Sequence, residues 1–217
     1  MRLVDSHSLR DLKPAFRKEV GELQSWIDDT PEFCTVKGMY VTGILQALDN
    51  FGIEHPDLRV QAFKDYPLRD YMVLLLNAAL TMHPGQAPKE GLRLLGQLAV
   101  PTFAYSLVGA VITSTVGRNW EMGLKFVSRG YELSLKPGTA VVAELADGRA
   151  LVELRDVWNF GDSYQVGVME GLMSACDVQG TVTAKSTSRC DVDLHLEWEA
   201  RGARRARQSA SDRAQAD

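Results

Sequence analysis

The chain has 217 residues, of which 45% are hydrophobic and 24% are charged, and its formal net charge at pH 7 is −4. This composition excludes a collagen, a coiled coil and a wholly disordered chain, and the acidic balance argues against a dedicated nucleic-acid-binding protein. At roughly 100–200 residues per domain, we expect one compact domain that needs no disulfide or metal in order to fold.

The first half of the chain predicts a series of helices. Apolar residues recur at three- and four-residue steps from Leu12 to Trp26, which predicts an amphipathic helix over residues 10–27 that ends before Pro31. The same periodicity predicts helices over residues 36–51, 68–82, 89–116 and 120–135. We expect a kink at Pro101 in the long fourth helix, and an N-cap at Asn119 for the fifth.

No charged residue occurs between Leu94 and Gly117, a length that could span a bilayer. Gln97, Pro101 and several Ser and Thr residues dilute the apolar content of this segment, so we expect a buried helix rather than a membrane span. The N-terminus lacks the apolar stretch of a signal peptide, and the cysteine count is odd without a CxxC spacing. We therefore expect a cytoplasmic protein with reduced thiols.

The second half changes to the two-residue period of strands. Strands are predicted over residues 139–146 and 149–158, joined by the hairpin dipeptide Asp147-Gly148, and again over residues 181–188 and 190–199. A helix over residues 165–176 separates the two hairpins. The predicted fold is α+β, with N-terminal helices packed on a small antiparallel sheet of two hairpins and an intervening helix.

The predicted organisation has three parts. Residues 1–32 hold the N-terminal helix, and residues 33–200 form an α+β domain of the ligand-binding kind. Residues 201–217 are rich in Arg and contain no apolar residue larger than Ala. Because such a segment cannot bury enough apolar surface to offset its ordering entropy, we expect a disordered tail.

The sequence contains no recognisable catalytic or metal-binding motif. Its four histidines, His7, His55, His83 and His195, lie on different predicted elements, without the spacing of zinc ligands. Phosphate-binding glycine loops and the GxSxG nucleophile motif are also absent. We therefore expect no enzyme, no metal and no cofactor, with His83 at a helix end and His195 on the solvated face of a strand.

Two glycines lie on one face of the helix over residues 165–176. Gly167 and Gly171 are one turn apart, which permits another backbone to approach this helix closely. The partner could be another element of the fold or a ligand pressed against bare backbone. Aromatic residues offer a second pointer, because Phe103 and Tyr105 lie on the apolar helix while others cluster near residues 158–164. A cleft between that helix and the sheet would suit a ligand, or would be an ordinary core.

Two stretches, residues 68–109 and 157–171, resemble a paralogous domain-of-unknown-function family expanded in myxobacteria. Residues 36–43 fit the family too, and the resemblance covers roughly residues 33–199. More distantly, a strand, an aromatic turn, a Gly-xxx-Gly helix and two strands with a Cys opening the last resemble the 4-vinyl reductase small-molecule sensor domain. That domain shares its fold with the haem nitric-oxide-binding and TRAPP-type domains.

The distant resemblance implies dimerisation through helices and an apolar ligand held between helices and sheet. Some such domains bind zinc through cysteines, but here only Cys190 matches, with Ser163 and Val182 at the other ligand positions, so zinc is not expected. Haem-binding relatives use a helix His and a Tyr-x-Ser-x-Arg signature, from which the stretch from Tyr131 to Leu135 departs, so haem is not expected either.

We therefore predict a non-catalytic sensory or regulatory domain that binds a small apolar ligand between helices and sheet as a cytoplasmic homodimer. No nucleic-acid or membrane partner is expected. The alternative is a protein-interaction or scaffold module whose core is filled by its own side chains. The candidate ligand-binding residues are Phe103, Tyr105, Tyr131, Trp158, Phe160 and Tyr164.

Overall fold

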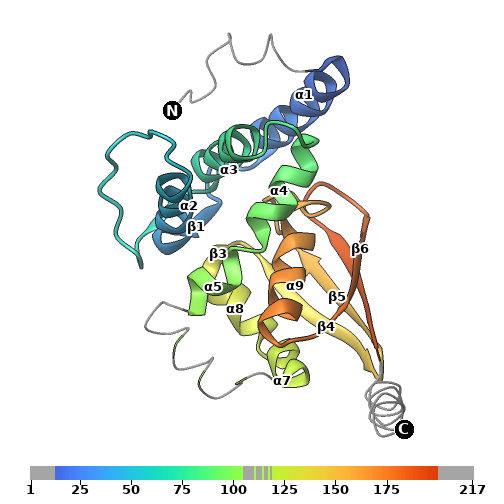
Figure 1. Ribbon diagram of the computed structural model, residues 1–217. Helices are drawn as coiled ribbons and strands as arrows, with labels where there is room; N and C mark the ends of the chain where they lie inside the picture. The colour runs from blue at the N-terminus through green and yellow to red at the C-terminus, as the bar shows by residue number, and fades with distance from the viewer. Residues whose placement is uncertain (1–12, 105–109, 111–113, 115–116, 118, 200–217) are drawn as a thin grey trace, which may run out of the picture.

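The computed structural model describes residues 13–104, 110, 114, 117 and 119–199 (Figure 1). Its helices are α1 (Pro14–Asp29), α2 (Gly38–Asn50), α3 (Leu68–Met82), α4 (Pro88–Gly96), α5 (Ala99–Ala104), α7 (Trp120–Lys125), α8 (Val127–Ser134) and α9 (Tyr164–Ala175). Its strands are β1 (Thr35–Lys37), β2 (Asp65–Pro67), β3 (Leu135–Lys136), β4 (Thr139–Ala146), β5 (Arg149–Arg155), β6 (Gly180–Ser186) and β7 (Val192–Trp198). The fold is α+β, as the sequence predicts. The expected tail after residue 200, His7 and Tyr105 lie outside the described residues.

The larger sheet consists of the two predicted hairpins. Its strand order is β4-β5-β7-β6, every neighbouring pair is antiparallel, and β5 joins the hairpins by pairing with β7. Val152 and Leu194 are register partners at the centre of the sheet, and both are fully buried. Because side chains alternate between the faces of a strand, one face is apolar and the other carries His195, which is exposed. Figure 1 shows α9 lying along the sheet, with α4 and α5 beside it.

A smaller sheet, of order β2-β1-β3, corrects the helix boundary expected at residue 36. Val36 pairs with Tyr66 of β2 on one side and with Leu135 of β3 on the other, so α2 begins only at Gly38. A strand of three residues is too short for its two-residue period to be recognised in the sequence. The pairing with β1 also ends α8 at Ser134, one residue before the expected helix end.

The helix expected over residues 89–116 is interrupted before Pro101. α4 ends at Gly96, and α5 begins at Ala99. A proline ring displaces the carbonyl four residues before it, which here belongs to Gln97. The helix expected over residues 120–135 is likewise divided, at Phe126, into α7 and α8. The Asn119 cap is confirmed, because its side chain accepts a hydrogen bond from the Met122 N–H at 3.2 Å.

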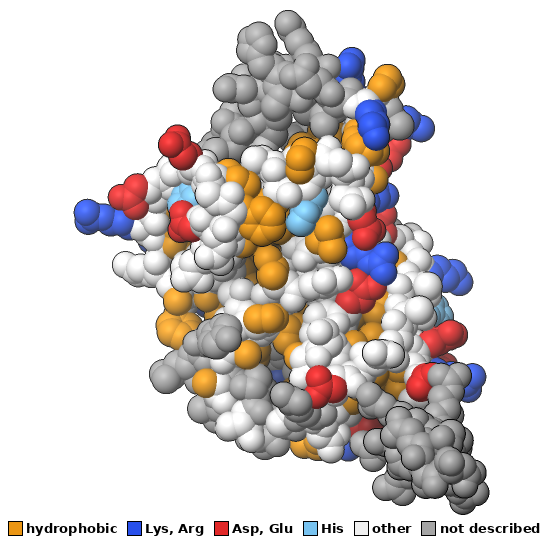
Figure 2. Space-filling model, in the orientation of Figure 1, with side chains coloured by type: hydrophobic (Ala, Val, Ile, Leu, Met, Phe, Trp, Pro, Cys, Tyr) orange, Lys and Arg blue, Asp and Glu red, His pale blue; other side chains and the backbone are white. Residues whose placement is uncertain are grey.

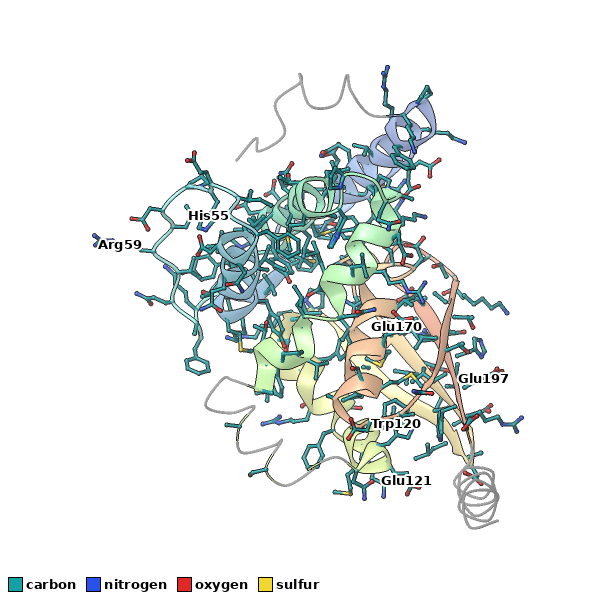
Figure 3. All side chains as sticks on the ribbon, viewed as in Figure 1. His55, Arg59, Trp120, Glu121, Glu170 and Glu197 are labelled. Atoms are coloured by element: carbon teal, nitrogen blue, oxygen red, sulfur yellow. The ribbon has the colours of Figure 1, made fainter. Side chains whose placement is uncertain are left out.

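α4 and α9 approach each other backbone to backbone. A Cβ placed on Gly167 would lie 1.9 Å from the Arg93 carbonyl oxygen, and one on Gly171 would lie 2.7 Å from that of Gln97. The expected close packing at the two glycines is therefore confirmed, and its partner is the end of α4. An ion pair closes the same contact, because the Arg93 guanidinium donates to both carboxylate oxygens of Glu170 on α9 (Figure 3).

The N-terminal helices share one hydrophobic core with the sheet. Leu23 and Trp26 of α1 are buried in it, and the Trp26 ring meets the Phe160 ring edge-on at a centroid distance of 5.8 Å. Figure 2 shows hydrophobic side chains between polar ones over α2 and α3, where Phe51 is 58% exposed and contacts the His83 ring edge-on. His83 is the C-cap residue of α3, as expected. Within the described residues, no helix combines the length and apolar content that a bilayer crossing requires.

A valine at position 171 tests the contact between α4 and α9. The branched side chain has no room beside the Gln97 carbonyl, so we expect Gly171→Val to lower the free energy of unfolding by about 1–3 kcal/mol. The melting temperature then falls by roughly 2–4 °C per kcal/mol. Gly21→Val in α1 is the control, because nothing lies within 4 Å of its Cβ position and only helix propensity changes. A Gly171→Val protein that melts at or above the parent temperature would contradict the packing described.

Candidate functional site

A cavity of about 140 Å³ lies among the helices that surround the smaller sheet. Its walls come from α2, α3, α5, α7, α8 and α9, together with β1 and β3. The apolar part of the lining consists of Val36, Ala99, Val100, Phe103, Gly123, Phe126, Val127, Gly130, Leu135, Val168, Met169 and Leu172. The polar part consists of Tyr40, Tyr71, Ser134, Asn159, Tyr131, Tyr164 and Gln165. No Asp, Glu, Lys, Arg, His or Cys side chain is among the described residues that line it.

Four tyrosines from four different helices converge on this cavity. Tyr40 lies in the first turn of α2, Tyr71 in the first turn of α3, and Tyr164 is the first residue of α9. Tyr131 lies in the middle of α8. Because α2, α3 and α9 all begin near the cavity, their first turns direct these rings into one space.

The hydroxyl groups of the tyrosines are held by short hydrogen bonds. Ser134 Oγ donates to the Gly130 carbonyl, so the Tyr40 hydroxyl, at 2.6 Å from Ser134 Oγ, is the donor in that pair. The hydroxyls of Tyr71 and Tyr164 lie 2.8 Å apart and bond to each other. These bonds fix the rings at the wall of the cavity, since a buried hydroxyl without a partner is costly.

A second polar chain crosses the wall from α8 to the turn before α9. Tyr131 donates to Gln165 Oε1, and Gln165 Nε2 donates to Asn159 Oδ1 at 2.7 Å. All three residues are buried. This series of hydrogen bonds positions the start of α9 against α8, and each side-chain amide oxygen in it accepts a hydrogen bond.

Burial keeps the four tyrosines protonated. It raises the pKa of Tyr40 to about 12, and it raises the pKa of Tyr71, Tyr131 and Tyr164 well above the ordinary tyrosine value. At neutral pH the cavity therefore carries no charge. Its polar groups are neutral hydroxyls and amides, and they occupy a minor part of the wall.

The candidate residues from the sequence fall into three groups. Phe103, Tyr131 and Tyr164 line the cavity. Phe160 is fully buried against Trp26, Trp158 is partly buried against the core, and neither is among the residues that line the cavity. Tyr105 lies outside the described residues.

Sequence reasoning missed Tyr40, Tyr71 and Gln165. Tyr71 shares the buried face of α3 with Leu68 and Leu75, where an aromatic residue resembles any other core residue. The available signal was a hydroxyl group on a helix face that is otherwise apolar, because a buried hydroxyl needs a hydrogen-bond partner. The partner, Tyr164, is 93 residues away along the chain, so only the fold shows the pairing.

The described residues contain no group of His, Cys, Asp and Glu side chains that could hold a metal ion. Cys34 and Cys176 are buried, and burial raises the pKa of both thiols. A second, larger hollow of about 570 Å³ lies beside Trp120 and Trp198. Its walls include Glu121, Asp147 and Glu199, which distinguishes it from the uncharged cavity.

The burial of the tyrosines can be tested by alkaline titration. The pKa values of these tyrosines in the folded protein lie above the unfolded value of about 10. The protonated tyrosines therefore stabilise the folded state fully below pH 10, and this stabilisation is lost as the pH rises through the folded-state pKa values. We expect phenolate absorbance from the four cavity tyrosines to appear together with loss of the native circular dichroism. Protein in guanidinium chloride is the control, with every tyrosine ionising near its ordinary pKa. Ionisation of all tyrosines near pH 10 with an intact dichroism spectrum would contradict the assignment.

The fold is similar to that of H-NOX proteins of solved structure. A mutant H-NOX protein from K. algicida in the Fe(II) unliganded state has a TM-score of 0.56 and 14% identity, covering 76% of this chain and 97% of its own. An H-NOX protein from S. oneidensis in the Fe(II)NO state has a TM-score of 0.55 and 10% identity, covering 75% and 99%. An oxygen-binding H-NOX domain related to soluble guanylate cyclases has a TM-score of 0.51 and 14% identity, covering 76% and 92%. At these identities the likeness establishes the fold alone.

The sequence itself points to a family. No curated protein matches the sequence of this chain. The profile of the family described as "Protein of unknown function (DUF2378)" matches residues 33–199, which include every residue assigned to the cavity wall. The chain belongs to the DUF2378 family.

Proposed function

We propose that this protein is a non-catalytic sensory or regulatory domain that binds a small, neutral, apolar molecule in the cavity. The observation that carries the proposal is a cavity of about 140 Å³ with a mainly apolar wall. A buried apolar cavity of about 150 Å³ stays dry in water and binds benzene or xenon. The similarity to H-NOX proteins supports a sensory role, because the fold is one in which solved relatives bind a small ligand.

The chemistry of the wall supports binding rather than catalysis. The titratable side chains among the described lining residues are tyrosines, and their raised pKa values make them poor acids and bases near neutral pH. The ion pair of Arg93 and Glu170 lies outside the lining. A ligand in the cavity would therefore be held by packing contacts and hydrogen bonds, without a catalytic group beside it in the described wall.

The residues present do not fit a haem group, which is named for an H-NOX protein of solved structure. The described space of about 140 Å³ is close to that of a cavity that holds benzene, which is small for a porphyrin. No His or Cys among the described residues lines it, and the tyrosines are held protonated. Met169 lines the cavity but lacks a lining His with which to share an iron, so the usual sets of axial ligands are not in place. His55 lies in the loop between α2 and β2, where it bonds to Asp49, and His83 and His195 also lie outside the lining (Figure 3).

The proposal is tested by filling the cavity from a position where the fold has room. Gly130 of α8 lines the cavity, and no atom of the residues that the structure describes lies within 4 Å of its Cβ position. Gly130→Leu should therefore fold at least as stably as the parent, because leucine is the better helix former by about 0.5–1 kcal/mol. Its side chain would occupy the ligand space. Gly21→Leu is the matched control, since Gly21 is also helical and also has open space at its Cβ.

The measurement is the melting temperature with and without benzene as the probe. Saturation at 100 times the dissociation constant stabilises a protein by about 2.7 kcal/mol, which corresponds to several degrees at this chain length. We expect this rise in the parent and in Gly21→Leu, and none in Gly130→Leu. An unchanged melting temperature of the parent in saturating benzene would refute an apolar binding cavity.

The proposal includes a cytoplasmic homodimer. The resemblance implies a contact through helices, but we place the contact on the edge strand β4. Beyond Ala140, whose carbonyl already accepts from Ser128 of α8, Val141 and Leu145 of β4 are 51% and 41% exposed, and an apolar edge strand invites pairing. We expect Val141→Lys to lower the dimer fraction measured by sedimentation velocity. A parent protein that sediments as a monomer at every concentration would exclude the dimer.

A further inference from the structure

We propose that the ligand of the cavity carries a hydrogen-bond acceptor, such as a ketone oxygen, that receives the spare hydroxyl proton of the Tyr71–Tyr164 pair. This inference rests on the proposed function and adds the chemical class of the ligand. The buried polar groups of the cavity wall carry one hydroxyl proton more than they use.

The Tyr71–Tyr164 pair has one proton more than it uses. Each hydroxyl is a donor of one proton, and the two hydroxyls bond to each other at 2.8 Å, which consumes one of the two protons. Tyr71 is 2% exposed and Tyr164 is 3% exposed, so both side chains are buried. In the described part of the chain, neither hydroxyl has a further partner.

The other three hydroxyl donors of the wall are already engaged. The Tyr40 proton goes to Ser134, whose own proton goes to the Gly130 carbonyl. The Tyr131 proton goes to Gln165 Oε1. The spare hydroxyl proton therefore belongs to the Tyr71–Tyr164 pair.

Both side-chain amide oxygens of the wall already accept a hydrogen bond. Gln165 Oε1 accepts from Tyr131, and Asn159 Oδ1 accepts from Gln165 Nε2. The Asn159 amide nitrogen adds donors rather than acceptors. A molecule with an acceptor atom would satisfy the wall, whereas a ligand that only donates would leave the spare proton without a partner.

Size and charge complete the description of the ligand. The space of about 140 Å³ suits a ring the size of benzene with a short substituent. The absence of any charged side chain among the described lining residues disfavours an ionised ligand, because a buried charge needs a partner. The class is a small, neutral, mainly apolar carbonyl compound.

Acetophenone and α-methylstyrene are suitable probes, because they have nearly the same shape and differ in having a carbonyl oxygen or a CH₂ group. Binding of each to the full chain is measured by isothermal titration calorimetry. We expect the parent protein to bind acetophenone about five- to a hundredfold more tightly, the range that one buried unsatisfied donor represents. Equal or tighter binding of α-methylstyrene would overturn the inference while the proposed function stands. Failure of both probes and of benzene to bind would refute the proposed function itself.

Phenylalanine variants locate the donor. In Tyr71→Phe/Tyr164→Phe both hydroxyls are removed together, so no partner is left unsatisfied, and we expect the preference for acetophenone to fall at least threefold. Either single variant still has one hydroxyl with a free proton and should keep the preference. Tyr40→Phe, which lines the same cavity, is the control and should also keep it. An unchanged preference in the folded double variant, with folding checked by circular dichroism, would show that the tyrosine pair is not the donor.

Discussion

The backbone contact between α4 and α9 is the constraint on which the rest of the structure depends. α9 lies between the sheet on one side and α4 on the other, and it contributes Tyr164, Val168 and Met169 to the cavity wall. Gly167 and Gly171 allow the approach because any side chain there would collide with the carbonyl oxygens of Arg93 and Gln97. Gly96 of α4 does the same from the other helix, because a Cβ there would lie 2.1 Å from the Tyr164 carbonyl oxygen. The place of α9, and of Tyr164 in the cavity wall, therefore depends on three positions without side chains.

The same region shows how charge and apolar surface are separated. The bidentate ion pair of Arg93 and Glu170 holds the two helices together on the outer side of α9, where both groups reach water. On the inner side the polar atoms are hydroxyls and amides bonded mainly to one another. Hydrogen bonds of this kind hold the side chains of the wall in place, and they leave the remaining wall available for apolar contacts. Rigidity of this kind keeps a cavity open instead of allowing the core to collapse into it.

The sequence patterns predict the regular elements well and the irregular ones poorly. α3 and β4 match their expected bounds, because fifteen residues of helical period and the Asp147-Gly148 turn are strong local signals. The strand around Val36 was assigned to a helix, since its hydrogen bonds go to β2 and β3, far away along the chain. The break before Pro101 was expected as a kink, because the sequence does not show that the Gln97 carbonyl meets Gly171. For the site, the aromatic residues near α9 directed attention to the right helix, yet Phe160 belongs to the core and Tyr40 and Tyr71 were found only through the fold.

The central claim is that an uncharged, mainly apolar space exists among α2, α3, α8 and α9 and accepts a guest. Crystals of the protein held under xenon pressure test this claim most directly, because xenon binds apolar cavities without hydrogen bonds and is located by its anomalous scattering. The account predicts a xenon peak within contact distance of Phe103, Val168 and Met169, with the tyrosine rings unmoved. A map with no xenon there, and with side chains of the described wall filling the space, would contradict the account.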